Sequence, residues 1–340
     1  MAKVYVHLKS IGALPQITDI GARTLNVGTP TQRVEFVAGA VKEFAEQVDE
    51  YRKVFPGVPL VVALHRTFSG YWTPLERGAN GWPLSHQPEA YWAALKEYME
   101  GYEKLRKDHP RWPEFYYVVG AEMSNGGEDH VLFGKRCIET ARTIPGFKVI
   151  TCPNGLFEAR TYAPLVDVMA PNYAVPMSDA GLKGLPSAKT QLWIYQAFNR
   201  FNYGFYAEKV KATGSFKEWY TNPNQRPYND FDGTDLNAVI ALPAPDGQVS
   251  IPLAEEFAWG ITDFRYLKTL EEAIANAKTS RNPKAVAAAQ DAAKFLADIL
   301  GDINLDMDYY LNQAGFWDYS VYDTYRWRVA EQILKMKENM

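Results

Sequence analysis

Short apolar runs alternate along most of the chain with longer stretches in which apolar residues recur every three or four positions. The run Tyr-Tyr-Val-Val-Gly-Ala at 116–121 is β-branched and aromatic, and so predicts a buried strand. Segment 33–55 has apolar residues at helical spacing and predicts an amphipathic helix. Strands and helices that alternate in this way are typical of βα units built around a parallel sheet.

The predicted elements can be laid out along the whole chain. Strands are expected at 3–8, 23–27, 58–64, 115–121, 147–152, 166–171, 191–196 and 215–220. Helices are expected at 33–55, 88–107, 129–142 and 199–213, and further helices at 253–277, 285–300 and 322–337. Parallel strands in this number, with helices between them, close into a (β/α)8 barrel.

The fold prediction is therefore an α/β protein with a TIM-type (β/α)8 barrel. The first βα unit has little room for a helix, so the barrel is expected to be irregular there. We expect a single domain over 1–340, with the barrel in about 1–280 and the helices of about 281–340 packed on its outside. The loop at 222–250 is rich in Pro, Asn, Asp and Gly, and long loops of this kind are usually functional.

Composition narrows the range of partners. The formal net charge of −4 argues against nucleic acid or an anionic membrane as the main partner. Aromatic residues make up 14% of the chain, and much of this content is expected in the core. The remainder falls in predicted loops, for example at Trp72, where exposed rings could line a cleft and stack on sugars. The oligomeric state is not predicted.

The sequence contains no motif that indicates a bound cofactor or metal. Cys137 and Cys152 are expected to be free buried thiols, and the five His residues show no ligand spacing. No phosphate-binding loop or nucleophile elbow is present, so we expect neither a cofactor nor a metal. There is no signal peptide and no apolar run of transmembrane length. The chain is expected to work in the cytoplasm, or outside the cell after removal of an export signal.

Glu122 is the strongest candidate for a catalytic residue. It follows the apolar run at 116–121 directly, and α/β barrels place their chemistry at the carboxyl ends of such strands. A purely structural role, in which Glu122 caps or pairs with the next loop, is the alternative. Other polar residues at predicted strand ends could bind sugar hydroxyls or satisfy loop backbone: His65, Asn154, Asn172, Tyr173 and Gln196.

Three segments resemble the catalytic barrel of glycoside hydrolase family 123 and its uncharacterised relatives. They are the stretch from Gln-Leu-Trp-Ile-Tyr at 191–195 to Trp219-Tyr220, the stretch from 245–247 to Trp-Gly-Ile-Thr-Asp-Phe-Arg-Tyr-Leu at 259–267, and the strand ending in Glu122. The resemblance covers roughly the second half of the chain. It implies hydrolysis of an oligo- or polysaccharide with Glu122 as the general acid. In the family an Asp precedes this Glu and orients a substrate 2-acetamido group, whereas Ala121 stands here.

Conventional glycoside hydrolysis needs a second carboxylate. Glu218 lies in the last predicted strand, but the resemblance favours an inward Trp219 beside it. Asp230 and Asp232, on the following loop, could reach over the site and are preferred. The competing hypotheses are a catalytically inactive barrel that binds glycans or serves assembly, and a lyase with Tyr173 or His65 as base. Asp263 and Arg265 are interpreted as a structural salt bridge.

Overall fold

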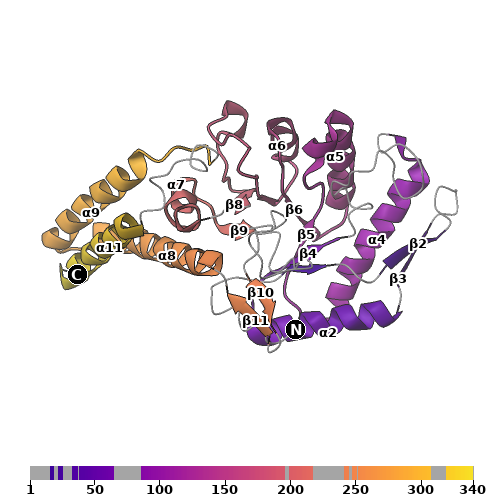
Figure 1. The fold of residues 1–340 in the computed structure, drawn as a ribbon, viewed down its shortest axis with the longest axis horizontal. Coiled ribbons are helices and arrows are strands. Elements are labelled where there is room, and N and C mark those ends of the chain that lie inside the picture. Colours follow the sequence, from indigo (N-terminus) through magenta and orange to yellow (C-terminus); the bar gives the residue numbers. More distant parts are fainter. Residues whose placement is uncertain are drawn as a thin grey trace. The chain divides into compact units, whose positions relative to one another are not determined.

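The computed structural model describes ten stretches of the chain. They are residues 16–18, 22–25, 33–36, 38–64, 86–195, 199–216, 241–244, 247–250, 252–307 and 319–339 (Figure 1). These residues belong to two compact units. The first comprises Met1–Val175 and Asp179–Gln191, and the second comprises Pro176–Ser178 and Leu192–Met340.

Among the described residues the main sheet contains seven strands, in the order β1-β4-β5-β6-β7-β8-β9. Their bounds are Gln16–Thr18 (β1), Leu60–Ala63 (β4), Phe115–Val118 (β5), Lys148–Thr151 (β6), Val168–Met169 (β7), Gln191–Tyr195 (β8) and Gly214–Phe216 (β9). Neighbouring strands run parallel, with Val62 opposite Tyr117 and Tyr117 opposite Val149. Within the described residues β1 and β9 end the sheet and do not pair with each other. The predicted closed eight-stranded barrel is therefore wrong.

The N-terminal region explains this error. The predicted strand 23–27 exists as β2 (Ala22–Leu25), but it pairs antiparallel with β3 (Arg33–Phe36) in a separate two-stranded sheet. The sequence Arg-Val-Glu-Phe of β3 alternates polar and apolar residues, which is a strand pattern. It lies at the start of the predicted helix 33–55, and the helix itself begins later, as α2 (Ala38–Val54). The predicted strand 3–8 lies outside the described residues.

The described helices of the first unit are α2, α4 (Glu89–Asp108), α5 (Glu128–Arg142) and α6 (Leu156–Tyr162), with the short helices η2 (Met123–Gly126) and η3 (Ala180–Leu182). Helices α2 and α4 pack on the sheet through aromatic side chains. Phe44 of α2 contacts Tyr102 of α4 and Phe115 of β5 edge to face. The Tyr117 ring stacks on Phe147 with centroids 4.0 Å apart. Much of the aromatic content is thus core, as predicted, because large rings bury much apolar area.

The second unit is mostly helical (Figure 1). After β8 and β9 it contains the hairpin β10 (Ala241–Ala244) and β11 (Gly247–Ser250), which lies within the predicted loop 222–250. The long helix α8 (Pro252–Lys278) packs against α9 (Pro283–Gly301) and α11 (Tyr319–Asn339). None of the helices among the described residues is long and apolar enough to cross a membrane.

A π-helical segment replaces much of the helix predicted at 199–213. It is η4 (Asn202–Tyr206), followed by α7 (Ala207–Lys209). Two glycines allow it to lie close against α8. A Cβ on Gly260 would stand 2.6 Å from the Arg200 carbonyl oxygen, and one on Gly204 would stand 3.0 Å from the Asp263 Cβ. A side chain at 260 would therefore clash with backbone at this crossing, and one at 204 would be tightly packed.

Candidate functional site

Glu122 lies at the carboxyl end of β5, in the loop that leads into η2. Its backbone N–H donates to the Cys152 carbonyl oxygen over 2.9 Å, which ties it to the end of the neighbouring strand β6. The residue has φ 59° and ψ 25°, in the left-handed region that L-residues other than Gly, Asn and Asp rarely occupy. The side chain is partly buried. Strained backbone of this kind gathers at functional sites, where the surrounding structure holds it in place.

Three further predicted residues lie at the same edge of the sheet. Asn154 follows β6, and Asn172 and Tyr173 follow β7. The Asn172 backbone N–H donates to the Pro153 carbonyl over 2.9 Å, and its side-chain amide donates to Asn154 Oδ1 over 2.8 Å. Asn172 Oδ1 accepts from the Tyr173 backbone N–H over 2.7 Å. The loops after β5, β6 and β7 are thus joined to one another, as expected for strand ends that meet at one edge.

The remaining predicted site residues lie outside the described residues. They are His65, Trp72, Gln196, Glu218, Trp219, Asp230 and Asp232. Their roles, including the choice of second carboxylate, stay predictions.

Glu158, in the first turn of α6, is a residue that the sequence analysis missed. Its side chain is 0% exposed, yet it is a carboxylate. Oε1 accepts from the Met123 N–H over 2.8 Å, while Oε2 accepts from the Ser124 N–H over 3.1 Å, the Ser124 hydroxyl over 2.7 Å and the Asn154 N–H over 3.0 Å. Burial raises the pKa of Glu158 above its ordinary value, although these hydrogen bonds act to lower it.

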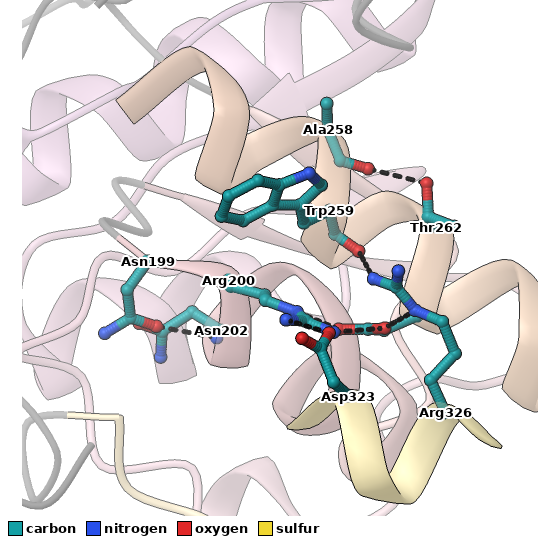
Figure 2. Close-up of polar contacts among 9 residues, drawn as sticks. Asn199, Arg200, Asn202, Ala258, Trp259, Thr262, Asp323 and Arg326 are labelled. Atoms are coloured by element: carbon teal, nitrogen blue, oxygen red, sulfur yellow. Dashed lines mark hydrogen bonds and ion pairs between the residues drawn. The ribbon is translucent and has the colours of Figure 1, made fainter. Parts of the chain in front are cut away.

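A buried ion network occupies the second unit (Figure 2). Arg200, 2% exposed, donates from Nε to Asp263 Oδ2 over 2.6 Å and from Nη2 to Asp263 Oδ1 over 3.1 Å. Arg326 donates from Nε to Asp263 Oδ1 and from Nη2 to the Trp259 carbonyl oxygen. The exposed Asp323 lies 2.8 Å from Arg200 Nη1. Asp263 is thus in a structural salt bridge, as predicted, but its partners are Arg200 and Arg326 rather than the exposed Arg265.

Comparison of the chain with models of known protein families found no match, and comparison with curated proteins found none either.

Proposed function

We propose that the chain is a glycoside hydrolase that acts on an oligo- or polysaccharide, with Glu122 as its general acid. The observation on which this rests is the placement of Glu122 in left-handed backbone at the carboxyl end of a central parallel strand. A carboxyl group that protonates a leaving oxygen must hold its proton near neutral pH, and partial burial favours this. Glu122 is partly buried.

The neighbouring amides support a polar, uncharged ligand such as a sugar. Because Asn172 donates to Asn154 Oδ1, the Asn154 side chain has its NH2 group left to offer as a donor. Sugar hydroxyls accept hydrogen bonds from such groups. Asn154 and Asn172 are both partly buried, so their orientations are set by the loops that hold them. The second carboxylate of the proposed mechanism comes from Asp230, Asp232 or Glu218, with the two loop aspartates preferred.

The distance between the two carboxyl groups would reveal the stereochemistry of the reaction. A separation of about 5–5.5 Å corresponds to retention of the anomeric configuration, and one of roughly 6.5–9.5 Å to inversion. A structure with a bound oligosaccharide that shows no carboxylate within about 10 Å of Glu122 would contradict the conventional mechanism.

One observation favours a second candidate, a protein of this fold that binds glycans without cleaving them. Ala121, at the position where the resembled family has an orienting Asp, is 0% exposed and packed in the interior. The chain therefore lacks the carboxylate that substrate-assisted cleavage would use there. Screening on aryl glycosides and on plant and bacterial polysaccharides separates the candidates. Binding without turnover supports the non-catalytic protein, and unsaturated products support a lyase with Tyr173 or His65 as base.

A stability measurement tests whether Glu122 is present for structure or for function. We expect Glu122→Gly to raise the free energy of unfolding by about 1 kcal/mol, because left-handed backbone costs an L-residue about 1–2 kcal/mol and the greater freedom of Gly in the unfolded chain offsets part of the gain. Urea unfolding gives the value. Glu122→Gln keeps the strain and should leave stability nearly unchanged. A clear decrease in the free energy of unfolding in both variants would mean that the Glu122 carboxylate stabilises the loop, and would support the structural interpretation.

A further inference from the structure

The Glu158 carboxylate accepts hydrogen bonds from backbone N–H groups of two loops. The donors are the N–H groups of Met123 and Ser124, directly after Glu122, and the N–H group of Asn154. Each of these residues follows a strand that has already ended, so the sheet supplies no acceptor for its N–H. Buried backbone donors without partners are costly, and one fully buried side chain supplies the acceptors for all three.

We propose that Glu158 is the positioning residue of the site, which holds Glu122 and Asn154 in their working geometry. This inference rests on the proposed function of Glu122. The loop from 122 to 124 is fixed at two points, by the Glu122 N–H bond to Cys152 and by the bonds of Met123 and Ser124 to Glu158. These bonds hold the backbone on both sides of Glu122, whose own conformation is left-handed.

The local sequence agrees with this role. Gly155 is the N-cap residue of α6 and lies against Ser124, so closely that a Cβ at this position would stand 2.5 Å from the Ser124 Oγ. Absence of a side chain at 155 therefore lets Ser124 reach the Glu158 carboxylate. The Ser124 hydroxyl completes the set of donors on Oε2.

The backbone donors of both loops are satisfied only if the side chain at 158 has an acceptor at both oxygen positions. Glu158→Gln keeps the shape but turns one oxygen into an NH2 donor. If that group takes the Oε1 position it faces the Met123 N–H, and if it takes the Oε2 position it faces the N–H groups of Ser124 and Asn154. In either orientation a backbone donor loses its acceptor, and the loop is released at that point.

The test compares Glu158→Gln with a matched control, Glu103→Gln. Glu103 is also a buried carboxylate of the first unit, 2% exposed, and is bonded by Arg106 and the Tyr117 hydroxyl. It lies in α4, near Gly146, on the side where β5 and β6 begin rather than where they end. Both variants lose one buried carboxylate, but only Glu158→Gln should alter the loops of the site.

Hydrogen exchange measured by mass spectrometry is the first readout. We expect faster exchange at residues 122–126 and 153–155 in Glu158→Gln and no change there in Glu103→Gln. Kinetics on a substrate found in the glycoside screen is the second. There kcat should fall about 10²-fold in Glu158→Gln with little change in KM, because a small misplacement of a catalytic group costs about this much.

If Glu158→Gln does not fold, Ser124→Ala provides the same test in a milder form, because it removes only the hydroxyl bond to Oε2. Unchanged exchange at 122–126, or equal losses of kcat in the Glu158 and Glu103 variants, would overturn the inference. A wild-type protein without hydrolytic activity would overturn the proposed function instead, and the exchange measurement would still decide whether Glu158 holds the two loops.

Discussion

Glu122→Gln is expected to lower kcat for glycoside hydrolysis by about 10²–10⁴-fold, the usual contribution of general acid–base catalysis. The substitution keeps the size of the side chain and removes the proton that would pass to the leaving oxygen. The loss should depend on the leaving group. Aryl glycosides that release a stable phenolate need little protonation and should lose least, whereas polysaccharides should lose most. Initial rates on both kinds of substrate measure the effect.

Glu128→Gln is the matched control for this prediction. Glu128 lies in the first turn of α5, six residues beyond Glu122, and is exposed. The same chemical change there should leave the rate close to that of the wild-type protein. A Glu122→Gln variant that keeps the full rate, or that loses the same factor on every leaving group, would exclude Glu122 as the general acid.

The largest expected effect on stability is in the second unit. Asp263→Asn should lower the free energy of unfolding by about 3–5 kcal/mol, because removing one partner of a buried ion pair is strongly destabilising. The buried Arg200 would keep the exposed Asp323 as a carboxylate partner. Arg200 is 2% exposed and donates to both carboxylate oxygens of Asp263, and Arg326 also donates to Oδ1. An amide NH2 group in place of either oxygen would therefore face an arginine N–H group. Denaturant unfolding followed by tryptophan fluorescence gives the value.

Asp323→Asn serves as the comparison. Asp323 pairs with the same arginine, but its side chain is 60% exposed, so water can replace it. We expect a loss of about 1 kcal/mol or less, as for other exposed pairs. Equal losses in the two variants would contradict the expectation that the buried carboxylate of this network (Figure 2) contributes more to stability than the exposed one.

The central strands could be predicted because their sequences leave few alternatives. The runs at 58–64, 115–121 and 147–152 are almost continuously apolar, and each contains a strand, β4, β5 and β6. The number of strands in the sheet could not be predicted in the same way. Whether β2 joins the parallel sheet or pairs with β3 depends on contacts between segments that are distant in the sequence or fold together. The order of apolar and polar residues along the chain does not specify those contacts.

The polar residues at the carboxyl edge of the sheet could be predicted in part. Asn154 and Asn172 follow neighbouring strands, and carboxyl ends of parallel strands lie side by side, so their hydrogen bond agrees with the sequence analysis. Glu158 could not be found in this way. Hydropathy would bury Phe157 and expose Glu158, but Phe157 is 48% exposed and Glu158 is 0% exposed. The backbone N–H groups of the two loops require an acceptor at Glu158, and these groups come together only when the loops have folded.

Both cysteines of the chain are hidden from solvent, Cys137 at 0% exposure and Cys152 at 1%. Burial also raises the pKa of the Cys137 thiol, so little of the reactive thiolate is present near neutral pH. The native protein therefore offers no competing target to a maleimide dye. A cysteine introduced at the exposed Asn125, three residues from Glu122, could be labelled selectively. A fluorophore there would test the proposed glycan binding, whether or not turnover follows.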